Sequence, residues 1–209
     1  MSETQPMVFV IDDDQSVRDA LDSLFRSVAL NVRTFGSAQE FLAAERSDAP
    51  ACLVLDIRLP GQSGLDFQNE LAASGIDLPV IFITGHGDIP MSARAFKAGA
   101  IEFLTKPFRD QELLDAVMAG IERDRARRAE ISNTHELRKC FASLTPRERE
   151  VMARIADGWP NKKVAADLKL SEVTVKVHRG QVMRKMRAKS LADLVRMADK
   201  LRVVPTEKS

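Results

Sequence analysis

The stretch Met7-Val-Phe-Val-Ile-Asp-Asp-Asp14 joins a short apolar run to three carboxylates, and it decides how the first half of the chain folds. Three later runs also end in a polar residue: Leu53-Val-Leu-Asp56, Ile81-Phe-Ile-Thr84 and Phe103-Leu-Thr-Lys106. Short apolar runs bounded by turn residues are typical of buried strands. Because the carboxyl ends of parallel strands lie at one edge of a sheet, the pattern predicts that these polar residues meet there.

Helical segments separate the apolar runs. Strands are expected at 7–11, 31–35, 52–55, 80–83 and 101–104, with 31–35 at an edge of the sheet. Helix-like spacing of apolar residues occurs at 16–28, 37–44, 65–73, 91–98 and 111–122. Alternation of strands and helices predicts an α/β doubly wound (βα)5 domain, with a parallel sheet covered on both faces, over residues 1–122.

The second half of the chain contains no strand-like run. After a charged, helical linker over 123–142, helices are expected at 146–157, 161–168, 172–186 and 191–201. Four short helices predict a small all-α tetrahelical domain over 143–209, and its second and third helices are spaced like a helix-turn-helix. The apolar residues expected to face its core include Val151, Ile155, Val164, Leu168, Val173, Val175, Val182 and Met186.

The 209-residue chain has a formal net charge of only +1, but its charges are divided unevenly. Residues 1–122 carry 9 lysines and arginines against 19 aspartates and glutamates, whereas residues 123–209 carry 22 against 11. An acidic module can hold a cation, and a basic one can bind a polyanion. The apolar runs are too short to span a bilayer and the first residues do not resemble a secretory signal, so we expect a cytoplasmic protein with no membrane partner. Cys52 and Cys140 fit neither a disulfide framework nor a zinc motif, and buried thiols are expected.

The polar residues at the predicted sheet edge suit phosphoryl transfer to a carboxylate. Asp13, Asp56 and a backbone carbonyl can supply the oxygen ligands that Mg²⁺ prefers. Lys106 and the hydroxyl of Thr84 can hold the other oxygens of the transferred group. Asp56 is the candidate nucleophile because it stands alone after an apolar strand. Taken singly, each residue has a plain structural alternative, such as a solvated acidic loop, and only their joint presence favours a phosphate site.

Residues 7–122 resemble the receiver domain of two-component response regulators. The matching residues are Asp12-Asp13, Asp56 with the Arg58-Leu-Pro-Gly turn, Thr84 and Lys106-Pro107. The resemblance implies that a sensor histidine kinase phosphorylates Asp56 and that the site binds Mg²⁺. Its implied ligands are Asp13 directly, Asp12 through water, Asp56, and the backbone carbonyl of Arg58.

The resemblance also implies a cis peptide between Lys106 and Pro107. Gly85 is expected to leave room for the incoming phosphodonor. Phe103 is expected to move with Thr84 as a switch, although a plain core phenylalanine is the alternative. Arg58 and His86 are expected to influence the lifetime of the phosphoryl group.

The predicted helix at 172–186 carries several cations and follows a helix that begins Asn161-Lys-Lys163. Basic residues on one helix are often only a solvated face, but in this order they are typical of a recognition helix. The residues expected to contact base edges are Thr174, Lys176, Val177 and Gln181, with Lys176 bound to guanine and Val177 against a thymine methyl group. Phosphate contacts are expected from Asn161, Lys162, Lys163, Arg179, Arg184 and Lys185. His178 either contacts phosphate or packs.

Gly180 lies inside this predicted helix, where glycine costs about 1 kcal/mol relative to alanine. Either that face of the helix must lie close to a groove wall, or it packs tightly against a neighbouring helix. Residues 144–202 resemble a LuxR/FixJ-type helix-turn-helix domain, through Leu144-Thr-Pro-Arg-Glu-Arg-Glu150 and Ser171-Glu-Val-Thr-Val-Lys-Val-His-Arg179. Trp159-Pro160 departs from the family pattern and leaves the start of the second helix uncertain.

In the LuxR/FixJ family the last helix pairs two output domains. Here its apolar stripe consists of Leu191, Leu194, Val195 and Ala198, although the core could claim the same residues. Together the two resemblances imply a regulator that dimerises when phosphorylated and binds promoter DNA. Activation of transcription is expected, with RNA polymerase as a further partner, and the protein is not expected to be an enzyme.

Two alternatives remain open at this point. One is an atypical DNA-binding regulator that does not depend on phosphorylation. The other is a metal-dependent phosphohydrolase with an aspartyl nucleophile. Arg58 stands where such enzymes usually carry a second acid, which disfavours the phosphohydrolase.

Overall fold

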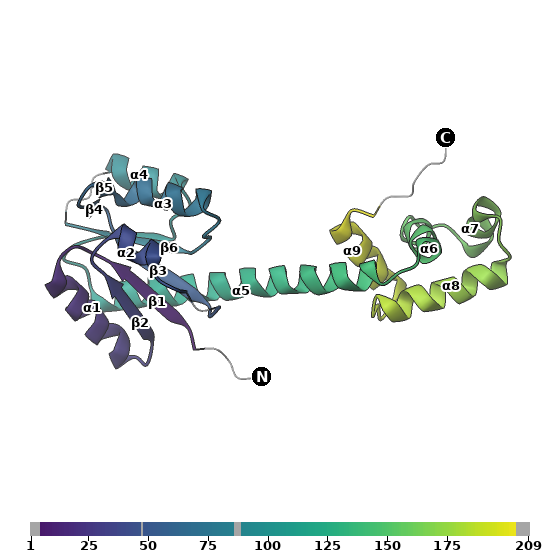
Figure 1. Ribbon diagram of the computed structural model, residues 1–209, viewed down its shortest axis with the longest axis horizontal. Coiled ribbons are helices and arrows are strands. Elements are labelled where there is room, and N and C mark those ends of the chain that lie inside the picture. Colours follow the sequence, from purple (N-terminus) through teal and green to yellow (C-terminus); the bar gives the residue numbers. More distant parts are fainter. Residues whose placement is uncertain (1–4, 47, 86–88, 204–209) are drawn as a thin grey trace. The chain divides into compact units, whose positions relative to one another are not determined.

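The computed structural model describes residues 5–46, 48–85 and 89–203 (Figure 1). The chain divides into two compact units, residues 1–128 and residues 129–209, each of which is described by itself. Within the described residues, no helix is both long and apolar enough to cross a membrane.

A five-stranded parallel sheet forms the centre of the first unit. Its order is β2 (Asn31–Phe35), β1 (Met7–Ile11), β3 (Ala51–Asp56), β6 (Val80–Thr84) and β7 (Glu102–Thr105). The helices of this unit are α1 (Gln15–Ser27), α2 (Ala38–Ala43), α3 (Gly64–Ala73), α4 (Ile89–Lys97) and the first part of α5 (Asp110–Ala142). The doubly wound (βα)5 fold is confirmed, and β2 lies at an edge as predicted.

Alternate residues of each strand face opposite sides of the sheet and belong to two separate cores. On β1, Phe9 and Ile11 pack with α2, α3 and α4, whereas Val8 and Val10 pack with α1 and α5. Cys52 of β3 lies in the second core, where burial raises the pKa of its thiol to about 12. A Cβ at Gly120 of α5 would lie 2.6 Å from the Cys52 sulfur, so glycine is required for α5 to pack this closely.

A short antiparallel hairpin, β4 (Arg58–Leu59) and β5 (Gln62–Ser63), follows β3 and was not expected from the sequence. It folds the chain back over the end of β3. Gly64 closes it by donating its N–H to the carbonyl of Ile57 at 2.8 Å. A side chain at Gly64 would overlap the carbonyl oxygen of Asp56, so this glycine keeps the loop tight against the polar edge of the sheet.

The linker expected over 123–142 is not a separate element, because α5 continues unbroken from Asp110 to Ala142. Asp124 is fully buried and accepts the backbone N–H of Ala51 at 2.9 Å. It also accepts hydrogen bonds from Arg127 and Arg128, each at 2.6 Å. Burial opposes its ionisation, but these bonds outweigh burial and lower the pKa of Asp124. The first unit therefore extends to Arg128, past the expected boundary at residue 122.

Asp124→Asn should lower the free energy of unfolding by about 1–3 kcal/mol, because two guanidinium groups lose their partner carboxylate. The folded pKa of Asp124 lies below its usual value of 3.8, so this contribution is present above that pH and is lost as the pH falls through the folded pKa. Urea denaturation should therefore show a difference between variant and wild type near neutral pH that shrinks in acid. Asp115→Asn, at an exposed position of α5, is the control, and an equal loss in both variants would contradict the assignment.

The second unit contains α6 (Pro146–Ala156), α7 (Asn161–Leu168), α8 (Glu172–Lys185) and α9 (Leu191–Leu201) around one core. Thr145 and Glu148 form the expected capping box at the start of α6. The uncertain start of the second helix is now fixed, since α7 begins at Asn161 with Pro160 as its N-cap residue. The all-helical domain is confirmed. The prediction that Val173 faces its core is wrong, because this side chain is 73% exposed.

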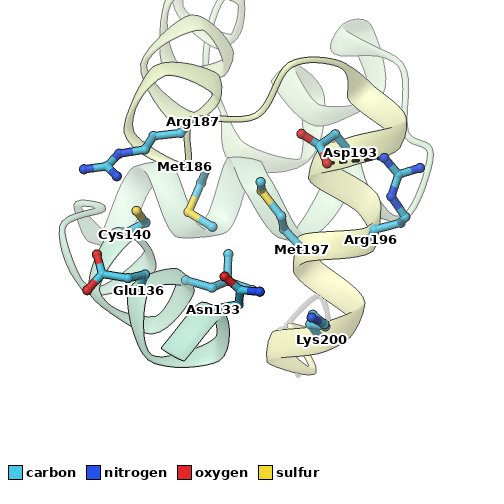
Figure 2. Close-up of a pocket in the computed structure, with 10 residues that line it drawn as sticks. Asn133, Glu136, Cys140, Met186, Arg187, Asp193, Arg196, Met197 and Lys200 are labelled. Atoms are coloured by element: carbon cyan, nitrogen blue, oxygen red, sulfur yellow. Dashed lines mark hydrogen bonds and ion pairs between the residues drawn. The ribbon is translucent and has the colours of Figure 1, made fainter. Parts of the chain in front are cut away.

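The C-terminal part of α5 belongs to this second unit. Leu137, Cys140 and Phe141 pack against its core, and Cys140 is half-buried. A pocket of about 400 Å³ opens where α5 meets the end of α8 and the helix α9 (Figure 2). Its lining residues are Asn133, Glu136, Leu137, Cys140, Met186, Arg187, Asp193, Arg196, Met197 and Lys200. The segment expected as a charged, helical linker is helical, and its residues are divided between the two units.

Candidate functional site

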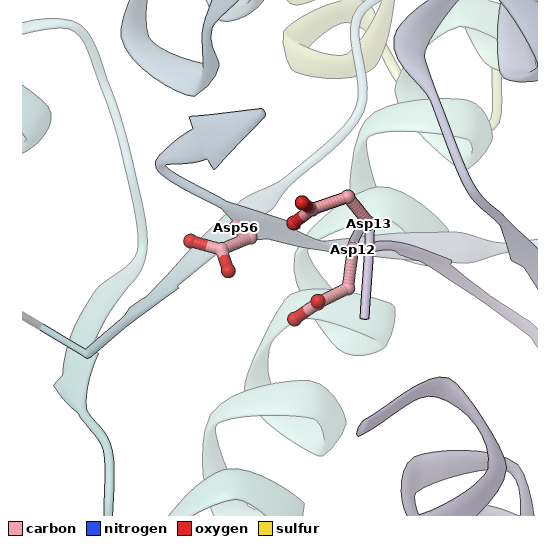
Figure 3. A group of neighbouring side chains, drawn as sticks. All are labelled: Asp12, Asp13 and Asp56. Atoms are coloured by element: carbon pink, nitrogen blue, oxygen red, sulfur yellow. The ribbon is translucent and has the colours of Figure 1, made fainter. Parts of the chain in front are cut away.

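Three carboxylates meet at the carboxyl edge of the sheet, as the sequence predicted (Figure 3). Asp12 and Asp13 follow β1, and Asp56 is the last residue of β3, the strand next to β1. One oxygen from each of the three lies within 4.8 Å of the others. Asp12 and Asp56 are buried, whereas Asp13 is exposed, so the cluster is open to solvent on the side of Asp13.

Lys106, which follows β7, reaches into the acidic cluster. Its Nζ lies 2.7 Å from Oδ2 of Asp12 and 3.0 Å from Oδ2 of Asp56. The expected cis peptide between Lys106 and Pro107 is confirmed. The second oxygens of both carboxylates accept backbone N–H groups, from Asp14 at 2.9 Å and from Arg58 at 3.0 Å. These bonds fix the orientation of Asp12 and Asp56.

The electrostatics of the cluster follow from its burial. Removal from water raises the pKa of Asp12, even though the ammonium of Lys106 opposes this shift. Burial also acts against the charge of Lys106, but its hydrogen bonds to Asp12 and Asp56 outweigh burial and raise the pKa of Lys106. Lys106 therefore stays cationic, and its single charge contacts Asp12 and Asp56 in a cluster that also contains Asp13. An oxygen-binding divalent cation fits such a set of hard donors.

Asp14 and Arg18 have roles that the sequence reading missed. Asp14 caps α1 by accepting the N–H of Ser16 at 2.8 Å, and it is not a member of the carboxylate cluster of Asp12, Asp13 and Asp56. Arg18, one turn into α1, donates to the backbone carbonyl of Asp12 at 2.5 Å. An acidic residue directly before a helical segment is an N-cap signal, which could have separated Asp14 from its neighbours.

The other predicted residues of this edge lie around the cluster. Thr84 ends β6 with a fully buried side chain, and its carbonyl accepts the N–H of Lys106 at 2.7 Å. Gly85 is exposed, and a Cβ there would meet nothing within 4 Å. Phe103 of β7 is half-buried against the first core, so both of its expected roles remain open. The side chain of Arg58 is exposed, and His86 lies outside the described residues.

The basic unit presents one exposed face of α8. Lys176, Val177, Gly180 and Arg184 are all exposed and recur at helical spacing, so they share that face. A Cβ at Gly180 would meet nothing within 4 Å. Tight packing against a described neighbouring helix is therefore excluded as the reason for this glycine, and close approach to a groove wall stays a prediction.

Several residues predicted to contact DNA have partners within the unit. Lys185 donates to Glu148 at 2.6 Å and so ties α8 to the capping box of α6. Its ammonium can reach a phosphate only by leaving this half-buried pair. The remaining contacts are Arg179 to Asn161 at 3.5 Å, Lys163 over the ring of Trp159 at 3.7 Å, Thr174 to Ser171 at 2.8 Å, and Arg184 to Gln181. His178 is half-buried, and Lys162 is exposed at the start of α7.

The apolar stripe predicted for dimerisation on α9 is divided between core and surface. Leu194 and Ala198 are buried in the core of the unit, at 0% and 1% exposure, and cannot form a contact surface in this conformation. Leu191 is 39% exposed and Val195 is half-buried. Leu194 and Ala198 lie on the face of the helix that packs against the domain core. Of the four residues, only Leu191 and Val195 therefore remain available to a partner.

Two families match the two halves of the chain. Residues 8–118 match the family described as response regulator receiver domain, and residues 142–198 match bacterial regulatory proteins, luxR family. Nodulation protein W of Bradyrhizobium diazoefficiens is 58% identical over 96% of this chain and 88% of its own. Response regulator protein TodT of Pseudomonas putida is 45% identical over 97% and 89%. Transcriptional regulatory protein FixJ of Rhizobium meliloti is 40% identical over 93% and 96%.

Solved structures agree with these relatives. Response regulator StyR superposes with a TM-score of 0.84 and 48% identity, covering 94% of this chain and all of that one. Full-length FixJ from B. japonicum has a TM-score of 0.58 and 36% identity, covering 96% and 99%. The carboxylate–lysine cluster, the exposed basic helix and these similarities point the same way: the chain belongs to the response regulators that join a receiver domain to a LuxR-type DNA-binding domain.

Proposed function

We propose that this response regulator accepts a phosphoryl group on Asp56 from a sensor histidine kinase in a Mg²⁺-dependent reaction. We further propose that the phosphorylated protein dimerises and binds promoter DNA in the cytoplasm, where it activates transcription with RNA polymerase. Phosphorylation and dimerisation are typical of the family. The observation that carries the proposal is the meeting of Asp12, Asp13 and Asp56 with Lys106 at one sheet edge.

In the proposed reaction, a carboxylate oxygen of Asp56 attacks the phosphorus atom of the donor phosphohistidine. An O–P bond forms, the P–N bond breaks, and the imidazole leaves with a proton from solvent. Asp13, Asp56 and the carbonyl of Arg58 would hold Mg²⁺, with Asp12 acting through water, and the cation would offset the charge that gathers on the phosphoryl oxygens. Gly85 leaves the donor an open approach.

The product carries roughly −1.5 to −2 charges where one carboxylate stood. Lys106, already within hydrogen-bond distance of Asp56, is placed to bind a phosphoryl oxygen. Thr84 ends the neighbouring strand and is the second group proposed to bind the phosphate, with Phe103 moving alongside it. A shift of population from 1:99 to 99:1 needs about 5.5 kcal/mol of differential interaction, which these contacts and a dimer interface would supply together.

The unmodified protein and the protein treated with acetyl phosphate and Mg²⁺ should be compared by intact mass and by footprinting on genomic DNA. We expect one added phosphoryl group, dependent on Mg²⁺, and protection of specific sites at lower protein concentration. No added mass, or identical footprints despite full modification, would favour a regulator that does not depend on phosphorylation. Catalytic turnover of small phosphomonoesters would favour a phosphohydrolase instead of the non-enzymatic regulator.

Gly180→Ala should separate stability from DNA affinity. Because a Cβ at this position meets nothing, the variant should gain about 1 kcal/mol of stability from the higher helix propensity of alanine. If α8 lies close to the wall of a DNA groove, the added methyl group should at the same time weaken binding. Thermal denaturation and titration of a footprinted duplex measure the two effects, and unchanged affinity would show that the groove does not require the glycine.

A further inference from the structure

Val173 is an unexpected feature of α8, the proposed recognition helix. Among the described residues of the second unit, Val173 and Val177 are the most exposed large apolar side chains, at 73% and 58%. They stand four residues apart and therefore lie on the same face of the helix. Val175, which lies between them in the sequence, is fully buried, so this valine faces the core of the unit and its two neighbours do not.

The surroundings of the two valines suit a polyanion better than an apolar partner. Lys176 stands between them on the exposed side, and Arg184 lies further along the same face. Gly180, between Val177 and Arg184, adds no side chain and lets a surface approach the backbone. An apolar pair flanked by cations matches the major groove of DNA, where phosphates line the edges and the thymine C5-methyl is an apolar group on the base edge.

We infer that Val173 is a specificity residue that contacts a thymine methyl group, in addition to the thymine methyl contact already expected of Val177. This inference rests on the proposed function, namely that α8 enters the major groove. Four residues at a rise of 1.5 Å separate the two valines by about 6 Å along the helix. Base pairs are stacked about 3.4 Å apart and a helix in the major groove is inclined to the DNA axis, so the two methyl groups should lie no more than about two base steps apart.

The test uses the full-length protein treated with acetyl phosphate and Mg²⁺. Preferred duplexes are first selected from a random pool, and each thymine of the selected site is then replaced by uracil. Uracil keeps every hydrogen-bonding group of thymine and lacks only the methyl. We expect two replacements in each half-site, within about two base steps of each other, each to weaken binding about fourfold, the effect of one buried methyl group.

Two variants show which valine contacts which thymine methyl group. Val173→Ala should weaken binding to the thymine duplex and remove the uracil effect at one of the two positions of each half-site, and Val177→Ala should do so at the other. Val28→Ala, at a valine of the receiver that is 46% exposed, is the matched control and should retain both effects. Circular dichroism should be unchanged, since each side chain is exposed.

The possible failures are distinguishable. A protein that selects no duplex overturns the proposed function and this inference with it. A protein that binds its selected duplex equally well after every thymine is replaced overturns the inference alone. The same holds if Val173→Ala keeps both uracil effects, or if it changes only the dimerisation measured by sedimentation, which would assign this face to a second copy of the chain.

Discussion

The Asp56→Asn protein should gain no mass from acetyl phosphate or from a phosphorylated histidine kinase, and its affinity for DNA should no longer respond to either donor. An amide oxygen carries no negative charge and is a poor nucleophile, so no acyl phosphate can form. The fold should survive, because asparagine has nearly the volume of aspartate and its oxygen can still accept the N–H of Arg58. The loss of response should therefore be complete while the stability stays close to that of the wild type.

Asp66→Asn is the matched control for this variant. Asp66 is an exposed carboxylate of α3, outside the acidic cluster, and its loss should leave phosphorylation and DNA binding unchanged. Intact mass and a DNA titration with and without donor measure both proteins. If Asp56→Asn gains the full mass of a phosphoryl group, another residue is the acceptor. If it gains no mass but its affinity for DNA still responds to the donor, DNA binding does not depend on phosphorylation.

The second large effect concerns Lys106. Lys106→Met should lower the free energy of unfolding by about 2–4 kcal/mol near neutral pH without Mg²⁺, because two buried carboxylates lose their cation. Both contacts are short, at 2.7 Å to Asp12 and 3.0 Å to Asp56. Mg²⁺ should stabilise the variant more than the wild type, since it restores positive charge to a cluster that lacks it.

The pH dependence of this variant has a defined sign. Burial already raises the pKa of Asp12, and loss of the ammonium should raise it further. The carboxyl group then protonates at a higher pH, so the deficit in stability should shrink as the solution is made acidic. Lys97→Met, at an exposed position of α4, is the control. A Lys106→Met protein as stable as the wild type at every pH would mean that the cluster does not need its cation.

The strands and the acidic cluster could be predicted from the sequence because their signals are local. An apolar run followed by a carboxylate identifies both the strand and the end of the strand, and parallel topology then brings Asp12 and Asp56 together. Helix starts were predictable for the same reason, since Thr145, Ser171 and Ser190 all cap the helices that they precede. These features depend on residues a few positions apart.

The errors concern features that depend on distant contacts. Asp124 belongs to the receiver because Ala51, 73 residues earlier in the chain, supplies a backbone N–H. The charges of 123–142 contain no sign of this bond. The valines at positions 173, 175 and 177 are chemically identical, so the sequence does not show which of them is buried. The rotation of α8 about its axis buries the middle one. For Leu194 the sequence left both a partner and the domain core open, and the side chain lies in the core of its own unit.

The hydrogen bond between Asp124 and Ala51 has a consequence for signalling. Strand β3 is tethered at both extremities: Asp124 binds its first backbone N–H, and Asp56 at its far end is bound by Lys106 and by the N–H of Arg58. Every residue between them is buried. Sliding of the strand along its axis would break the Asp124 bond inside the protein, where no water replaces it. The central strand is therefore held in place at both ends. We expect the structural change that follows a modification at Asp56 to pass through the loops at that edge of the sheet, and not through movement of β3 along its axis.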